Sequence, residues 1–195
     1  VNAGEIINYK NGLDEALFKL FKPIDKSLLS IVRIACHMHE VESALPSCKL
    51  LKDMGYEVGF NLMQIADCTE AEIINVAHIA KEHPIDVLYF ADSMGSMNPR
   101  DTSNIINMLR SVWQKPLGIH THDNMGQAMA NSIYAMSNGV TWLDSTVTGM
   151  GRGPGNAQTE FLSIEVAELK KIPLNLSPLL KLIDKHFKPL KDLHS

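Results

Sequence analysis

The chain has 195 residues, enough for one sizeable hydrophobic core in a single domain. Hydrophobic residues make up 45% of it and charged residues 21%, ordinary globular values that argue against a disordered or low-complexity protein. The formal net charge is −4, from 18 Lys and Arg against 22 Asp and Glu, so no basic footprint for a nucleic-acid partner is present.

Membrane and disulfide signals are also missing from the sequence. No apolar run approaches the roughly 20 residues that a membrane span needs, and nothing resembles a signal peptide. The three cysteines, Cys36, Cys48 and Cys68, are an odd number and lack the CxxC spacing of zinc sites. The sequence therefore predicts a cytoplasmic protein without a membrane partner.

Strand and helix patterns alternate along the chain. Residues 1–3 match the tail of a strand, and residues 13–20 match the helix after it. Further strands are expected at residues 30–36, 56–63, 85–91, 116–121 and 141–147. Helices are expected at residues 40–54, from Thr69, at 98–113, at 125–137 and at 157–170, with Pro46 kinking the first helix or ending its first turn. The pattern amounts to six β/α units.

Leucines at helical spacing over residues 172–195 predict one more helix. This helix would either cover the domain or pair with a second copy, so a homo-oligomer is one expected arrangement.

Strands that alternate with helices imply a parallel sheet, because the crossover helix allows neighbouring strands to run in the same direction. An open doubly wound sheet and a (β/α)8 barrel share this alternation, and a barrel typically needs about 250 residues. The periodicity alone favours neither architecture.

Two histidines stand at the end of the strand expected at residues 116–121. On a strand, residues i and i+2 point to the same face, so His120 and His122 project together at the carboxyl end. Two imidazoles on one edge form half of a divalent-metal site with nitrogen ligands. In the alternative interpretation, one histidine belongs to the core and the other caps the next helix. Asp123, which follows them, would either cap that helix or orient a ligand histidine.

A glycine-rich loop follows the strand expected at residues 141–147. Residues 149–156 (GMGRGPGN) contain four glycines, which can adopt positive φ and approach a ligand closely. The loop could present amide groups to an anion or form a tight turn, but it does not match a nucleotide-binding motif. Asn156 would cap the next helix or supply an oxygen ligand to the same metal.

Other polar residues lie at the carboxyl ends of the earlier strands. Five of them are expected to bind substrate: Arg33, His37, Asn61, Asp92 and Ser93. In the alternative interpretation, Arg33 forms a structural ion pair with a carboxylate. Asp144, in mid-strand, is expected to be buried with a partner.

Several of these segments together resemble a known family. Residues 118–124 (GIHTHDN), Asp144 and the glycine loop are similar to the second half of the HMG-CoA-lyase-like barrels, also called DRE-TIM metallolyases. Within that superfamily they are most similar to the 4-hydroxy-2-oxovalerate aldolases. Residues 32–40, 59–63 and 91–95 match the family's strands four, five and six in order.

The resemblance implies a (β/α)8 TIM barrel, with residues 1–195 as one catalytic domain containing strands three to eight and a C-terminal helix. It implies a divalent metal, Mn²⁺ or Mg²⁺ and in some members Zn²⁺, held here by His120, His122 and Asn156. The implied activity is that of an aldolase or carbon–carbon lyase that acts on a 2-keto acid through a metal-stabilised, pyruvate-type enolate.

The chain also departs from the family pattern. The strand-one motif that supplies a metal Asp and a catalytic Arg has no match, so this Arg and the base are expected before Val1, and the chain alone is expected to be inactive. The glycine loop lacks the Cys of the lyases and the Gly-Glu-Arg of the Claisen-type synthases.

Three alternatives remain open at this point. They are a Claisen-type acyl-CoA condensing enzyme of the same superfamily, a metal-free barrel with a phosphate site in the glycine loop, and a degenerate, non-catalytic barrel.

Overall fold

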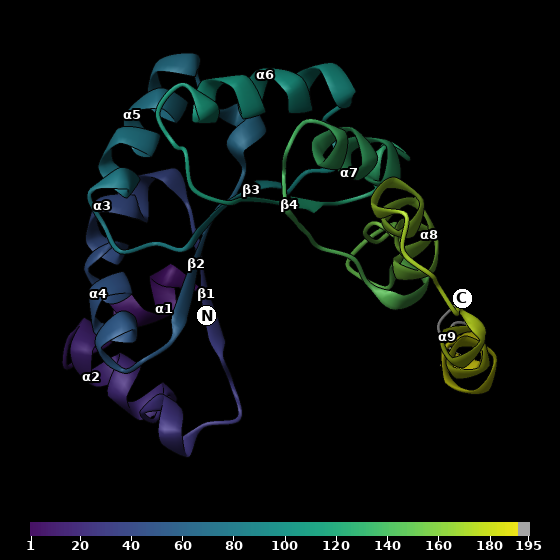
Figure 1. Ribbon diagram of the computed structural model, residues 1–195. Helices are drawn as coiled ribbons and strands as arrows, with labels where there is room; N and C mark the ends of the chain where they lie inside the picture. The colour runs from purple at the N-terminus through teal and green to yellow at the C-terminus, as the bar shows by residue number, and fades with distance from the viewer. Residues whose placement is uncertain (191–195) are drawn as a thin grey trace.

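The computed structural model describes residues 1–190 and shows a curved parallel sheet with helices along its outer side (Figure 1). The strands lie in chain order: β1 (Ile31–Cys36), β2 (Glu57–Leu62), β3 (Val87–Asp92), β4 (Leu117–Thr121) and β5 (Trp142–Leu143). Every neighbouring pair is parallel, which confirms the expected α/β class. The sheet is an arc, and in the described residues β1 and β5 are its two ends.

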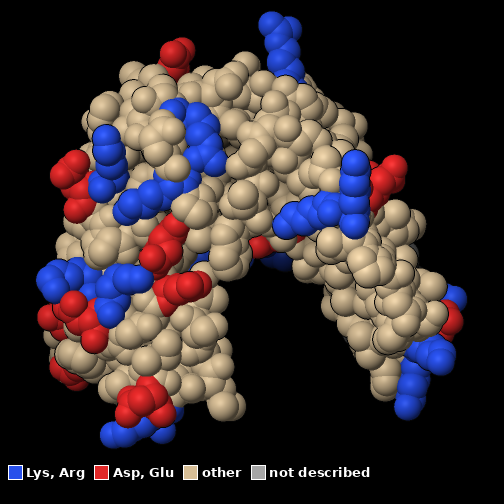
Figure 2. Space-filling model, viewed as in Figure 1, with Lys and Arg blue, Asp and Glu red and all other residues tan. Residues whose placement is uncertain are grey.

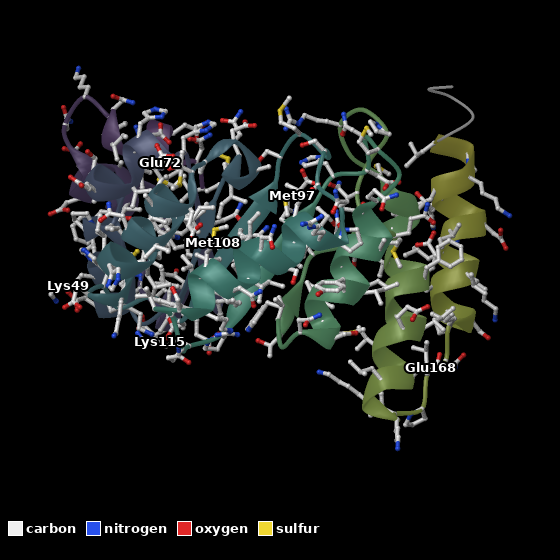
Figure 3. The ribbon with its side chains drawn as sticks, turned by 90° about the horizontal axis from the view of Figure 1, so that it is seen from above. Lys49, Glu72, Met97, Met108, Lys115 and Glu168 are labelled. Atoms are coloured by element: carbon white, nitrogen blue, oxygen red, sulfur yellow. The ribbon has the colours of Figure 1, made fainter. Side chains whose placement is uncertain are left out.

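The helices form the outer layer of the arc. They are α1 (Ala3–Ile7), α2 (Leu13–Leu20), α3 (Val41–Ala44), α4 (Pro46–Asp53), α5 (Glu70–Lys81), α6 (Pro99–Arg110), α7 (Ala128–Ser137), α8 (Thr159–Lys170) and α9 (Ser177–Leu182). Seen from above, α5, α6 and α8, marked by Glu72, Met108 and Glu168, follow one another along this layer (Figure 3). On the face shown in Figure 2, acidic and basic side chains are interspersed, and the molecule is hollowed on the side of the sheet.

Burial explains why these strands form. All six residues of β3 are buried, and the first five form the apolar run expected of a central strand. In β1 the burial alternates, because Val32, Ile34 and Cys36 pack under the helices while Arg33 and Ala35 face the concave side. The core therefore lies between sheet and helices, and the concave side is free for polar residues.

The beginning of the chain adds an isolated bridge to the outer edge of β1. Asn2 forms a parallel bridge with Ala35, whose amide donates to the Val1 carbonyl at 2.8 Å. The expected strand tail is confirmed for these first two residues, whereas Ala3 already belongs to α1.

Several boundaries differ from the sequence-based expectation. The expected strand at 141–147 is reduced to the two residues of β5, because a 3₁₀ turn at Val147–Gly149 follows, with Thr148 at φ 58°. α7 starts at Ala128 rather than at 125, since Gly126 at φ 67° first makes a turn. Of the helix expected at 172–195, the structure shows α9 and a π-turn at Ile183–Phe187, while residues 191–195 lie outside the described part.

The expected break at Pro46 is confirmed, because this proline occupies the first turn of α4 directly after α3. Within residues 1–190, the helices are too short or too polar for any of them to cross a lipid bilayer.

Candidate active site

Strand β4 brings the two predicted histidines to the same place. His120 pairs with Ala91 of β3 in the sheet register, and His122 follows directly after the strand. Their ring centroids are 5.0 Å apart and the ring planes are nearly perpendicular, at 85°. The period-2 argument from the sequence therefore placed both imidazoles on the same, concave face.

The glycine loop brings a third polar group to the histidines. Asn156 forms an antiparallel bridge with His122, and the amide of Asp123 donates to the Gly155 carbonyl at 2.9 Å. The Oδ1 atom of Asn156 is buried and has no hydrogen-bond partner among the described residues. A buried amide oxygen without a partner is costly, and this one lies in a loop bonded to the histidine segment.

The glycines of this loop are required by its shape. Gly155 has φ 102°, and a Cβ atom there would lie 1.9 Å from the Gly149 carbonyl oxygen. At Gly151 a Cβ atom would lie 2.2 Å from Nδ2 of Asn156. Larger residues at these positions would displace the loop that carries Asn156.

A carboxylate that follows β5, the strand next to β4, contacts His120. Nδ1 of His120 lies 2.8 Å from Oδ2 of Asp144, and the Arg33 guanidinium lies 2.6 Å from the same oxygen. Burial raises the pKa of Asp144, but the hydrogen bond with His120 and the charge of Arg33 outweigh it and hold this pKa below its usual value. Burial, together with the charges of His120 and Arg152, lowers the pKa of His122, which favours the neutral imidazole that binds metals.

The donor set suits a divalent ion. His120 and His122 offer imidazole nitrogens, and Asn156 offers an amide oxygen that otherwise lacks a partner. In the described part of the chain, no group of three or more His, Cys, Asp or Glu side chains is placed to hold a metal. The residues present therefore fit a site with two nitrogens and one oxygen, with further positions open to other ligands.

A cavity of about 510 Å³ opens beside these donors. Its lining includes His120, His122 and Asn156 together with Arg33, Asn61 and Ser93. The Oδ1 atom of Asn61 is also buried without a hydrogen-bond partner among residues 1–190. Two asparagines that line one cavity thus each keep a buried amide oxygen without a partner, which suits a cavity that receives hydrogen-bond donors or a cation.

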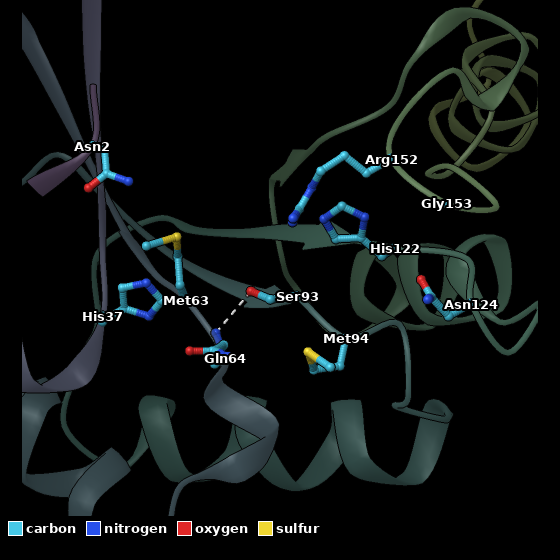
Figure 4. A pocket seen from close by; sticks show the side chains of 10 residues that line it. All are labelled: Asn2, His37, Met63, Gln64, Ser93, Met94, His122, Asn124, Arg152 and Gly153. Carbon is cyan, nitrogen blue, oxygen red and sulfur yellow. Dashed lines mark hydrogen bonds between the residues drawn. The ribbon is translucent and has the colours of Figure 1, made fainter. Parts of the chain in front are cut away.

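An adjoining cavity of about 560 Å³ shares His122 and Arg152 with the first (Figure 4). In Figure 4 the Arg152 side chain reaches toward His122, and His37 and Met63 lie on the opposite side. Ser93 accepts a hydrogen bond from the amide of Gln64 at 2.9 Å. The two cavities together could hold a molecule that extends from the histidines toward β1.

Most of the expected substrate-binding residues line these cavities. Arg33, Asn61 and Ser93 line the first cavity, and His37 lines the second, with its ring stacked on His39 at 5.6 Å. Asp92 is not brought together with them. Its carboxylate is buried and accepts hydrogen bonds from the amides of Ser96 and Met97, because the chain turns sharply after β3.

The sequence left two roles open for Asp123, and the structure shows capping. Its Oδ1 accepts from the Ala128 amide at the start of α7, at 2.9 Å, whereas Asp144 is the carboxylate that contacts His120. The sequence did not predict two further residues of the site: Tyr89, whose ring lies against the Arg33 guanidinium, and Arg152, which lines both cavities. Tyr89 has the apolar pattern of any strand residue, and the only signal for Arg152 is its place between two glycines.

The amino-acid sequence of the chain is similar to those of known proteins. A family model described as HMGL-like matches residues 26–184. The 4-hydroxy-2-oxovalerate aldolase of Pelotomaculum thermopropionicum is 36% identical over 143 residues, which are 73% of this chain and 41% of that protein. The enzyme of the same name from Carboxydothermus hydrogenoformans is 34% identical over 140 residues, 71% of this chain and 41% of that protein. The chain thus spans about two fifths of the length of these relatives.

Solved structures agree with the curved sheet. The N-terminal domain of a provisionally named aldolase from Bacteroides vulgatus is 30% identical with a TM-score of 0.77, covering 89% of this chain and 60% of that one. Hydroxymethylglutaryl-CoA lyase from Pseudomonas aeruginosa has a TM-score of 0.67 at 18% identity, covering 78% of this chain and 60% of that one, and shows the shared fold alone.

Proposed function

The chain belongs to the HMGL-like family, and from this membership we propose that its site binds a divalent metal ion and serves an aldolase. The substrate class is a 4-hydroxy-2-oxo acid, cleaved to a pyruvate-type keto acid and an aldehyde. The relatives named 4-hydroxy-2-oxovalerate aldolase support this class. Mn²⁺ or Mg²⁺ is the proposed ion, with Zn²⁺ as the alternative.

The observation that carries the proposal is that His120, His122 and Asn156 line one cavity, and that Oδ1 of Asn156 has no hydrogen-bond partner among the described residues. Two neutral imidazoles and one amide oxygen would hold the ion. When bound, the ion would act as a Lewis acid toward the 2-keto group and favour the enolate that the cleavage produces.

The chain's own residues would bind and orient the rest of the substrate. Asn61 lines the first cavity and would orient the substrate through its side-chain amide, and Arg152 brings a positive charge to the lining of both cavities. In the cleavage the bond between C3 and C4 breaks, the C4 hydroxyl loses its proton and becomes the aldehyde carbonyl, and C3 gains a proton.

The test is pyruvate release from 4-hydroxy-2-oxopentanoate by the protein purified from its complete gene, because the chain alone is expected to be inactive. The protein is supplied with Mn²⁺, and pyruvate is followed by its coupled reduction to lactate. We expect His122→Ala to lower the rate by at least about 100-fold, because even outer-shell partners of metal ligands are worth about 10–100-fold. His78→Ala, on the exposed side of α5, is the matched control and should retain the wild-type rate. Equal rates in His122→Ala and the wild type would contradict the proposal.

A further inference from the structure

The ion pair between Arg33 and Asp144 crosses the concave side of the whole sheet. Arg33 lies on β1 and Asp144 directly follows β5, so three strands separate them in the sheet order. The guanidinium nevertheless lies 2.8 Å from Oδ1 and 2.6 Å from Oδ2 of the carboxylate. The curvature of the sheet brings these residues together although they are 111 positions apart in the sequence.

The strands between them leave space for this crossing. Gly118 on β4 carries no Cβ atom, and one placed there would lie 2.3 Å from the Tyr89 ring. The ring of Tyr89 lies beneath the Arg33 guanidinium, whose Cζ atom is 4.6 Å from the ring centroid. A glycine on one strand and an aromatic platform on the next thus support the guanidinium in its position across the sheet.

The position of Asp144 determines which ring nitrogen of His120 carries the hydrogen. A carboxylate paired with a permanent cation is only an acceptor, so the Nδ1 atom 2.8 Å from Oδ2 must carry the hydrogen. In a neutral imidazole the other nitrogen, Nε2, then keeps its lone pair. A metal that binds His120 in this arrangement can only use Nε2.

We propose that Asp144, held by Arg33 across the sheet, is a positioning residue that fixes His120 as the Nδ1–H tautomer before any metal binds. The inference rests on the proposed function only in taking His120 as a metal ligand. The competing role is purely structural. In that case the ion pair would only connect β1 to β5, and Asp144 would not determine which ring nitrogen of His120 carries the hydrogen.

The test is long-range ¹H–¹⁵N spectroscopy of the metal-free, ¹⁵N-histidine-labelled protein. The chain has eight histidines, and His120→Gln identifies the signals of His120 by their loss. We expect a protonated Nδ1 and an unprotonated Nε2 in the wild type. In Asp144→Leu, which offers no acceptor, we expect the proton to move to Nε2 in a large part of the molecules.

Matched variants separate positioning from general damage. Asp86→Leu removes another half-buried ion pair, with Lys52, away from the site, and should leave the His120 signals unchanged. Should Asp144→Leu fail to fold, the double variant Arg33→Met/Asp144→Leu removes both charges together and leaves no unpaired cation. Mn²⁺ affinity, measured by equilibrium dialysis, should fall by about 10–100-fold in the Asp144 variants and not in Asp86→Leu.

The outcomes distinguish this inference from the proposed function. A wild-type His120 with its proton on Nε2, or one unaffected by the loss of Asp144, would overturn the inference even if Mn²⁺ binds. A wild type that holds the proton on Nδ1 through Asp144 but binds no Mn²⁺ would support the positioning and overturn the proposed function.

Discussion

At the scale of single residues, small and buried side chains decide what the site can contain. Glycines at positions 151 and 155 let the loop fold back on itself, so that Asn156 reaches the histidine segment. Ala91 stands beside His120 in the register, where a larger side chain would occupy the cavity. Small neighbouring residues thus leave the space that the polar side chains of the concave face occupy.

Thiol reactivity tests the burial assigned to single residues. Burial raises the pKa of Cys36 and of Cys48 to about 12, and both side chains lie in the core. Because the thiolate is the reactive form, we expect iodoacetamide at pH 8 to modify only Cys68, which is partly exposed.

Peptide mapping of the modified protein measures this, and unfolding in guanidinium is the control that should expose all three thiols. Rapid modification of Cys36 or Cys48 in the native protein would contradict the assigned packing.

At the scale of elements, the helices begin where capping residues place them. Asn98 precedes α6 and accepts hydrogen bonds from the amides of Arg100 and Asp101, while Asp101 accepts from the Asn98 amide. This reciprocal pair satisfies amides that the first turn would otherwise leave unpaired. α6 then covers the outer side of the sheet, and the site lies on the opposite, concave side.

Removing this cap should cost stability and leave the site intact. We expect Asn98→Ala to lower the free energy of unfolding by about 1 kcal/mol, the usual value for a lost N-cap. Urea unfolding measures the difference, with Asn107→Ala on the exposed side of the same helix as the control, expected to be neutral or slightly stabilising. Equal stability of Asn98→Ala and the wild type would contradict the capping assignment.

The elements that carry the site were largely predictable, because strong local signals mark them. Period 2 along β4 predicted that His120 and His122 share a face, and the glycines after β5 predicted the loop that carries Asn156. The sequence also indicated that Arg33 and Asp144 each have a charged partner. That they pair with each other depends on strand order and sheet curvature, which no local pattern contains.

At the scale of the whole molecule, the site belongs to the arc and not to any one element. Its cavity is lined from β1 through the loop after β5, and the ion pair between Arg33 and Asp144 joins the two ends of the described sheet. Bringing these residues together requires the entire curved sheet to form. Metal binding and folding should therefore be coupled in this protein.

The central claim is that His120, His122 and Asn156 hold one divalent ion. The most direct measurement is Mn²⁺ bound per chain after equilibrium dialysis of the purified protein, beside His120→Ala/His122→Ala and the control His78→Ala. We predict about one ion per chain in the wild type and the control, and none in the double variant. A wild type that binds no Mn²⁺, or a double variant that binds as much as the wild type, would contradict the account.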